Sequence, residues 1–369
     1  MRNVGIDLGT TNTSASLEGI LVRVPQERTE DTVVPSVVAF VPSGARLVGH
    51  PARRRRAIDA KNTIFSAKRL MGRRWSAPET QEFRRRYPFD MVEMKDGSVG
   101  FRTRAGVFDP ADIASMVLTQ VRQIVGVGEA VGSTITVPAG ASEEQRQATV
   151  LAGRRAGFSE VTLVEEPVAA ALAYGEKLKG SRVAVYDLGG GTFDFALLDC
   201  SGAKPTVLGH GSDMFLGGDD VDHALAGWAA DEVLKLHRWD LRQDPVVFDR
   251  LVAECERAKV RLSELPQTAV EPGQVDPMAL ENAAPLPLDR PVLARVCADL
   301  VRRTFITCDG VLRAAGISPR DVDAVVLAGG STRLPMIRDG VEHYFGKKPR
   351  EEIPVMHVVA LGAEAAGKA

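Results

Sequence analysis

The chain has 369 residues, of which 44% are hydrophobic and 25% charged, the composition of a globular protein. This length exceeds what one ordinary core needs, so we expect two domains of roughly 150–200 residues. The formal net charge of −2 gives no reason to expect binding to nucleic acid or to an anionic membrane.

The cysteines and the apolar runs indicate the compartment. None of the four cysteines has Cys-x-x-Cys spacing to another, which argues against zinc and redox motifs and fits a reducing compartment. No apolar run approaches the ~18 residues that span a membrane. A strand begins almost at the N-terminus and leaves no room for a signal peptide. We therefore expect a cytoplasmic protein, and we expect it to be a monomer.

The first half of the chain alternates predicted strands and helices. Residues 4–8, 13–17 and 34–41 are predicted strands, and residues 73–109 are a predicted peripheral subdomain. The four arginines at 53–56 indicate a solvated helix face, because no aromatic side chain is interleaved with them to stack on a base.

Two helix starts carry capping residues. Asp109, followed by Pro110, begins a helix predicted over 109–125. Ser142 begins the next predicted helix, and Gln145 stands at the capping-box position three residues later.

The second half repeats the opening pattern. The segment RVAVYDLGGGTFDFALLD, residues 182–199, places an apolar strand, Asp-Leu-Gly, a Gly/Thr turn and another apolar strand in the same order as residues 4–17. Such a match about half the chain apart indicates a duplication at domain scale, with a boundary near 177–182. Further on, a long helix is predicted to end near 264, and residues 266–290 read as a Pro-rich loop or weak hairpin.

Three predicted strand ends carry Gly/Thr turns, at 8–12, 188–192 and 328–332. Small residues in such turns let backbone N–H groups converge on phosphate oxygens. Asp7 and Asp187 stand at two of these ends, and a nucleoside triphosphate needs Mg²⁺, which carboxylates bind together with several retained waters. The sequence therefore predicts a nucleotide site between two halves.

Other nucleotide motifs fail. No Gly-x-Gly-x-x-Gly lies between a strand and a helix with an acid ~20 residues further on. The string at 362–368 nearly matches a P-loop, but Ala369 stands where Ser or Thr is required.

Seven segments, in order and spacing, resemble the ATPase domain of the 70-kDa heat-shock (DnaK-type) chaperones: GIDLGTTNT, QRQAT, EEPVAAALAYG, VYDLGGGTFD, LGGDDVD, CERAKVRLSE and LAGGSTRLP. The resemblance covers nearly the whole chain. It implies the α/β, two-lobed actin-like ATPase fold, in which duplicated ribonuclease H-like domains hold ATP or ADP in a central cleft. It also implies Mg²⁺ and a monovalent ion such as K⁺ as cofactors, a J-domain co-chaperone and a nucleotide-exchange factor as partners, and a role in the stress response.

On this resemblance, lobe I spans 1–181 with a peripheral subdomain at about 38–109. Lobe II spans 182–354 with a peripheral subdomain at about 223–299. Residues 355–369 are expected to form a helix that returns to lobe I. The family's peptide-binding domain is absent from the sequence, so we expect no clamping of unfolded peptide.

The resemblance also assigns catalytic roles. Lys68 matches a lysine that reaches the γ-phosphate, where a cation neutralises the charge that develops in phosphoryl transfer. Glu166 matches a carboxylate near the attacking water, and Thr192 is expected to orient that water or to accept phosphate itself. The acids expected around the metal, mostly through waters, are Asp7, Asp187 and Asp194, and Asp187 also counts as catalytic.

The remaining assignments concern nucleotide contacts. Those expected at the phosphates are Gly9, Thr10, Thr11, Asn12, Gly189, Gly190 and Gly191. Those expected along the rest of the nucleotide are Gly217, Gly218, Asp219, Glu256, Lys259, Ser263, Gly329, Gly330, Ser331 and Arg333. Glu256, Lys259 and Ser263 lie at i, i+3 and i+7 and so share one helix face. Pro138 and Arg146 match a proline switch and its arginine partner.

Some positions depart from the family. Val355-Met356-His357 replaces a Pro-Asp-Glu, which removes acids near the nucleoside, and Gly140-Ala141 replaces a common Tyr-Phe. The surface expected to bind a J-domain carries Thr162, Glu165 and Val168, and an acid at Glu165 should weaken docking of a partner that otherwise contacts acidic surface.

Two functions of different classes remain open. In the first, slow Mg²⁺-dependent ATP hydrolysis drives opening and closing of the lobes. In the second, the chain binds ATP or ADP as a regulatory or scaffold protein without useful hydrolysis, which the altered segment 355–357 favours. The presence of Lys68 and Thr192 favours the first. A sugar or acetate kinase, or an actin-like filament, is disfavoured because no residue can be placed as a catalytic Asp facing an acceptor pocket.

Overall fold

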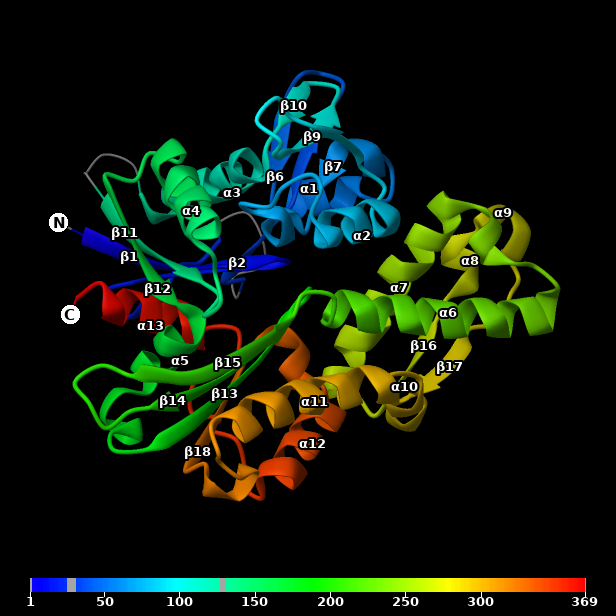
Figure 1. Cartoon of the computed structure of the whole chain (residues 1–369). Coiled ribbons are helices and arrows are strands. Elements are labelled where there is room, and N and C mark those ends of the chain that lie inside the picture. Colours follow the sequence, from blue (N-terminus) through cyan, green and yellow to red (C-terminus); the bar gives the residue numbers. More distant parts are fainter. Residues whose placement is uncertain (1, 25–30, 127–130, 369) are drawn as a thin grey trace.

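The computed structural model describes residues 2–24, 31–126 and 131–368. The chain forms two α/β lobes that face each other, and each lobe carries a smaller subdomain on the same side (Figure 1). Within the described residues, no helix has both the length and the apolar character needed to cross a membrane.

Lobe I is built on a mixed sheet with the strand order β12-β11-β1-β2-β3, and β4 pairs with β2. Its strands are β1 (Arg2–Leu8), β2 (Asn12–Leu17), β3 (Ile20–Leu21), β4 (Val33–Pro35), β11 (Val131–Val137) and β12 (Glu160–Glu165). β11 runs parallel to β1 and β12, whereas β2 is antiparallel to β1. Val4 and Ile6 on β1 are fully buried because helices cover the sheet.

The helices that pack on this sheet are α3 (Pro110–Val125), α4 (Glu143–Arg155), α5 (Glu166–Tyr174) and α13 (Val358–Ala366). The predicted caps are confirmed: Asp109 accepts a hydrogen bond from Asp112 N at the start of α3, and Ser142 accepts one from Gln145 N at the start of α4. α13 packs on α5 and β1, so the end of the chain lies beside its first strand (Figure 1).

The smaller subdomain of lobe I holds two three-stranded sheets, with the orders β6-β5-β7 and β10-β9-β8. Its elements are β5 (Val38–Phe40), β6 (Arg46–Val48), α1 (His50–Arg55), η1 (Ala60–Asn62), β7 (Thr63–Ile64), η2 (Ala67–Leu70), α2 (Pro78–Arg86), β8 (Asp90–Glu93), β9 (Val99–Thr103) and β10 (Gly106–Phe108). The arginines at 53–56 lie on and just after α1, as predicted. The predicted solvated face is wrong for Arg53 and Arg56, because they pair with Glu256 and Asp249 of lobe II.

The single strand predicted over 34–41 is wrong. β4 ends at Pro35, and β5 begins at Val38 in a different sheet. Ser36 accounts for the break, because its N–H donates to Thr11 O (2.8 Å) and its hydroxyl donates to Gly9 O (2.8 Å). These bonds turn the chain toward the β1–β2 connection instead of along a strand.

Lobe II is built on a sheet with the order β15-β14-β13-β18. Its elements are β13 (Arg182–Leu188), β14 (Phe193–Asp199), β15 (Thr206–Asp213), β18 (Ala324–Ala328), α11 (Ala298–Ala314), α12 (Pro335–Phe345) and the short η5 (Pro319–Asp321) and η6 (Gly330–Arg333). The short η3 (Gly175–Leu178) follows α5 and leads from lobe I into β13. β13 lies between antiparallel β14 and parallel β18, as β1 lies between antiparallel β2 and parallel β11. The structure thus repeats the arrangement that the sequence repeats.

The smaller subdomain of lobe II consists of α6 (Gly218–His237), η4 (Leu241–Gln243), α7 (Pro245–Glu264), β16 (Gln267–Val270), α8 (Pro272–Val275), α9 (Pro277–Leu280), β17 (Leu286–Asp289) and α10 (Arg290–Val296). The segment expected as a loop or weak hairpin is a hairpin, β16–β17, whose connection holds the two short helices α8 and α9.

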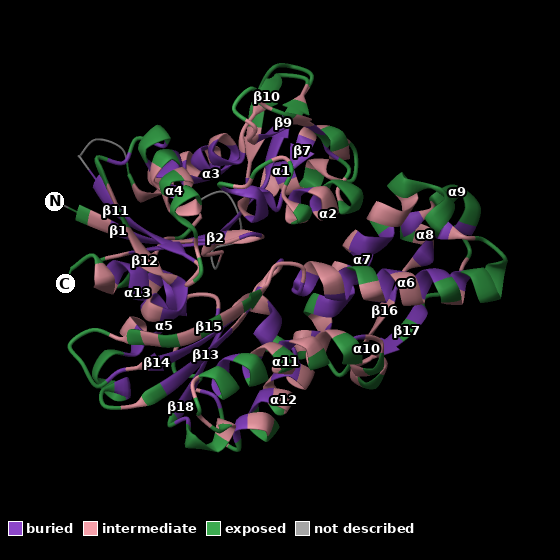
Figure 2. Cartoon of the chain, viewed as in Figure 1, coloured by how far each residue is buried: buried purple, intermediate pink, exposed green. Residues whose placement is uncertain are grey.

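Each lobe has its own hydrophobic core, and a third cluster joins them. Figure 2 shows buried residues along the strands and on the helix faces that cover them. The third cluster combines Ala169 of α5 and Val358 of α13 with Val183 and Val326 of the lobe II sheet. The two lobes therefore share an apolar base.

Candidate functional site

The first turn, Gly9–Thr11, connects β1 to β2 directly after Asp7. A Cβ at position 9 would lie 2.0 Å from Asn12 O, so the turn requires glycine there. Ser36 holds the turn through its bond to Gly9 O, and Thr136 Oγ1 donates to Asp7 Oδ1 (3.3 Å). Lobe I therefore fixes both the turn and the carboxylate that precedes it.

The second turn, Gly189–Thr192, connects β13 to β14 directly after Asp187. Gly189 N donates to Thr192 O (3.0 Å) and closes the turn. The first N–H groups of α6 then hold it from the other side: Gly218 N donates to Gly189 O (3.0 Å), and Asp219 N donates to Gly190 O (2.6 Å). The start of α6 is thus part of the site's framework.

The third turn, Gly329–Arg333, follows β18. Gly329 has a φ of 81°, and a Cβ there would lie 2.5 Å from Asp187 Oδ1, so only glycine fits. Ser331 Oγ donates to Gly189 O (2.8 Å). The third turn therefore packs directly against the second and leaves Asp187 room.

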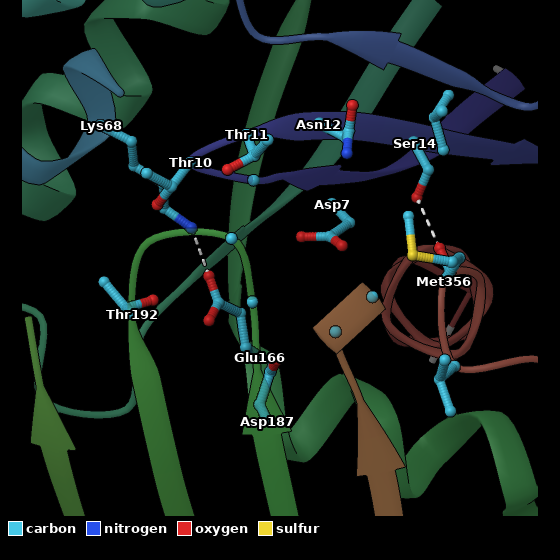
Figure 3. A pocket seen from close by; sticks show the side chains of 17 residues that line it. Asp7, Thr10, Thr11, Asn12, Ser14, Lys68, Glu166, Asp187, Thr192 and Met356 are labelled. Carbon is cyan, nitrogen blue, oxygen red and sulfur yellow. Dashed lines mark hydrogen bonds and ion pairs between the residues drawn. The ribbon is translucent and has the colours of Figure 1, made fainter. Parts of the chain in front are cut away.

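The three turns line one pocket between the lobes. Figure 3 shows Asp7 and the first turn on one side, with Asp187 on β13 and Thr192 in the second turn of the other lobe. The predicted residues in its wall are Asp7, Gly9, Thr10, Thr11, Asn12, Lys68, Glu166, Asp187, Gly189, Gly190, Thr192, Gly329 and Gly330. Residues that are far apart in the sequence thus meet in one place.

Lys68 and Glu166 form an ion pair in this pocket, with Nζ 2.5 Å from Oε1 (Figure 3). Glu166 is the first residue of α5, where a helix favours negative charge. Burial opposes the charge on Lys68, but Glu166 and Asp7 outweigh it and raise the pKa of Lys68 above its ordinary value. The lysine is therefore a fixed cation at the pocket wall.

Three half-buried aspartates lie around that cation. Burial, and then the charge of Glu166, raise the pKa of Asp7 and that of Asp194 to about 7, and raise the pKa of Asp187 well above its ordinary range. Asp187 and Asp194 face each other across the β13–β14 pair. Neighbouring carboxylates with raised pKa values favour a bound cation, because it would stabilise their ionised forms.

The donor set fits Mg²⁺ held through water. Within the described part of the chain, no three His, Cys, Asp or Glu side chains converge as a direct ligand set. Mg²⁺ keeps several of its waters and binds proteins through one or two carboxylates together with phosphate oxygens. Asp7, Asp187 and Asp194 are suited to hold such a water shell.

The first turn also fits a phosphate. Thr11 Oγ1 is buried and has no hydrogen-bond partner among the described residues. A Cβ at Gly190 would lie only 1.9 Å from this oxygen, so the first and second turns touch across the lobes. A buried hydroxyl without a partner is costly, and a phosphate oxygen between the two turns would satisfy it.

A comparison with protein families agrees with this geometry. The family model of the Hsp70 protein matches residues 3–368, which is nearly the whole chain. The chain belongs to the Hsp70 family. It is therefore an ATP-binding chaperone domain with the two-lobed actin-like fold of that family, whose members are ATPases in general.

Other residues that the Hsp70 resemblance assigned lie just outside the pocket wall. Asp219 and Glu256 line an adjoining cavity together with Thr10 and Thr11. Lys259 Nζ is buried and donates to Asp222 Oδ2 (2.9 Å) and Gly218 O (3.0 Å).

The remaining residues that the resemblance assigned lie in lobe II, some of them packed against the second turn and others at the surface. Ser331 and Gly218 are buried there, against the second turn. Asp194 and Gly217 lie behind that turn, Gly191 within it and Ser263 along α7. Arg333 Nη2 lies 3.0 Å from Glu264 Oε1 on the surface. The structure thus gathers the phosphate-end residues more tightly than the nucleoside-end ones.

Sequence reasoning missed Ser14 and Val33, which also line the pocket. Ser14 Oγ donates to Met356 O (3.3 Å), and Met356 Sδ would lie 2.8 Å from a Cβ at Gly330. Because alternate residues of a strand face the same side, Ser14 could have been inferred from Asn12 two positions earlier. No sequence pattern around Val33 indicated that it would line the pocket.

Proposed function

We propose that the chain binds Mg·ATP in the pocket between the lobes, hydrolyses it slowly to ADP and phosphate, and changes its lobe angle with the bound nucleotide. The observation that supports this most is the composition of one pocket: carboxylates from both lobes, two Gly/Thr turns and the Lys68–Glu166 pair. Neither lobe supplies the full set alone, so ligand binding and lobe position are coupled.

The proposed chemistry uses the chain's own groups in sequence. The γ-phosphate competes with Glu166 for Lys68, which neutralises the charge that develops on the phosphoryl oxygens. Glu166, freed from that pair, accepts a hydrogen bond from the attacking water, which Thr192 also orients. Bound Mg²⁺ would neutralise phosphate charge, with Asp7, Asp187 and Asp194 holding its waters.

A second candidate is a nucleotide-dependent regulatory or scaffold protein that does not turn over usefully. The observation that favours it is the wall formed by Val355 and Met356, which is apolar where the resemblance led us to expect acids. Hydrolysis and pure binding differ in one assay, steady-state phosphate release with and without a J-domain protein. Release that a J-domain stimulates supports the ATPase, and nucleotide binding without release supports the scaffold.

The partners and surroundings are proposed on the same basis. A J-domain co-chaperone and an exchange factor are proposed partners of a monomer in the cytoplasm, and K⁺ is proposed to accompany Mg²⁺. Glu165, on the surface assigned to the J-domain, pairs with Arg146 Nη2 at 2.7 Å. Part of its charge is thereby neutralised, so its effect on docking should be smaller than that of a free acid.

A further inference from the structure

Arg69, the residue after Lys68, lies in the seam between the lobes. It belongs to η2 in lobe I, and only 3% of its surface is exposed. An arginine stays charged at any physiological pH, so a buried one requires acceptors or ring faces around it. The groups around the guanidinium therefore show which parts of the protein Arg69 connects.

Its acceptors come from lobe II. Nη2 donates a hydrogen bond to Gly191 O in the second turn, and lies 3.8 Å from Asp219 and 3.9 Å from Asp220 at the start of α6. The guanidinium carbon lies 5.2 Å from the ring centre of Phe215 in lobe II and 5.8 Å from that of Tyr87 in lobe I. One side chain thus connects lobe I to the second turn and to the helix that supports it.

The approach to the second turn is too close for any side chain at position 191. A Cβ on Gly191 would lie 2.7 Å from both Nε and Nη2 of Arg69, and 2.7 Å from Thr10 Cγ2. Gly191 directly precedes Thr192, which lines the pocket. A shift of Arg69 would therefore move the peptide that carries Thr192.

Arg86 offers a control for Arg69. It also joins the two lobes, but it does not support the second turn. Arg86 Nη1 lies 3.0 Å from Asp220 Oδ1, and its guanidinium carbon lies 4.7 Å from the ring centre of Phe215. Like Arg69 it joins lobe I to the start of α6. It also pairs with Glu82 on its own helix (2.6 Å), but among the described residues it makes no ion pair or hydrogen bond to the second turn.

We propose that Arg69 is a positioning residue that fixes the second turn from lobe I, so that Thr192 reaches its working position only when the lobes are closed. This inference rests on the proposed ATP hydrolysis. Because Arg69 bonds a carbonyl of the turn, its loss should slow the chemical step more than it weakens nucleotide binding.

The test compares Arg69→Met with Arg86→Met in the full chain, using single-turnover ATP hydrolysis, ADP affinity and melting temperature. Arg69→Met is expected to slow hydrolysis about tenfold or more while the ADP Kd changes less than about threefold. Arg86→Met is expected to change the rate less than about twofold. If Arg69→Met does not fold, Arg69→Lys replaces it, since lysine keeps the charge but lacks the planar fork, and a loss of about threefold is expected.

Hydrolysis within about twofold of wild type in both Arg69 variants, with Asp187→Asn impaired, would overturn the positioning role and leave the proposed function standing. Equal losses in Arg69→Met and Arg86→Met would overturn it as well, since adhesion alone would then explain the effect. An unimpaired Asp187→Asn would overturn both proposals. A rate loss confined to Arg69, with ADP affinity retained, supports the inference.

Discussion

Lys68 Nζ lies 2.5 Å from Glu166 Oε1, although 98 residues separate them in the sequence. Both side chains are largely buried at the phosphate end of the pocket. The pair keeps a cation and a carboxylate ready at the place where phosphate charge and a water would meet. While they are paired, Lys68 is not available to a phosphate and Glu166 is not available to a water. We expect a bound ligand to separate them.

Lys68→Ala is expected to lower the single-turnover rate of ATP hydrolysis by about tenfold or more, because the cation that offsets the phosphoryl charge is lost. It should also lower the melting temperature without unfolding the chain, since Glu166 loses its partner. Lys61→Ala, at an exposed lysine of η1, is the matched control. A rate equal to that of this control would exclude the proposed role of Lys68.

The raised pKa values of Asp7 and Asp194 predict a pH effect on stability. A carboxyl whose pKa is higher in the fold than its unfolded value of ~3.9 contributes stability while protonated, and loses that contribution as the pH rises through about 7. The melting temperature of the nucleotide-free, magnesium-free chain should therefore fall as the pH rises from about 5 to about 7, and level off by about pH 8.

Asp194→Asn removes one of these carboxyls and should make that fall shallower. Adding Mg·ADP to the wild type should do the same, because a bound cation stabilises the ionised carboxylates. Melting curves across the pH range, recorded with and without Mg·ADP, measure both effects. A wild-type melting temperature that rises over this range would contradict the electrostatic description of the site.

The close packing of Gly362 predicts a stability effect that involves no residue of the pocket wall. It lies on α13, and a Cβ there would lie 1.7 Å from Ala169 O on α5. Gly362→Ala should destabilise the chain by roughly 1–3 kcal/mol through overpacking. Gly310→Ala on α11 is the control, because nothing lies within 4 Å of its Cβ, and it should instead stabilise by roughly 0.5–1 kcal/mol. Equal urea midpoints for the two variants would mean that α13 does not pack as described.

Two ion pairs cross the upper part of the cleft, Arg53–Glu256 and Arg56–Asp249, the latter at 2.8 Å. Half-exposed pairs contribute roughly 0.2–1 kcal/mol, so Asp249→Asn should speed ADP release by roughly 1.4- to 5-fold. The difference should shrink at high salt because charges are screened. Stopped-flow release of labelled ADP measures it, with Glu176→Gln, in a surface pair outside the cleft, as control. Slower release in Asp249→Asn would contradict the view that these two ion pairs help to hold the lobes closed over the nucleotide.

The sequence predicted those parts of the fold and site that repeat or have a local signature. Asp7 and Asp187 could be paired because the same Asp-Leu-Gly and Gly/Thr turn occurs twice, and the caps at Asp109 and Ser142 follow from residues three positions apart. The break at Ser36 could not be predicted, because its cause is a bond to a turn formed 25 or more residues earlier.

Arg69 shows the same limit more sharply. In the sequence it is one of many arginines in a polar segment, and nothing local separates it from a surface residue. Only the fold places it against Gly191, more than 100 residues away, and between two aromatic rings. Contacts that cross from one lobe to the other are decided by tertiary packing, which local patterns do not encode.

The most direct test of the account is single-turnover hydrolysis of radiolabelled ATP by the wild-type chain and by Asp187→Asn, each with Mg²⁺ and with EDTA. With Mg²⁺, the wild type is expected to release phosphate slowly, and the rate is expected to be at least about tenfold lower in EDTA and in Asp187→Asn, while both proteins remain folded without nucleotide. A wild-type rate equal to that of buffer alone, or an Asp187→Asn rate equal to the wild type, would contradict it.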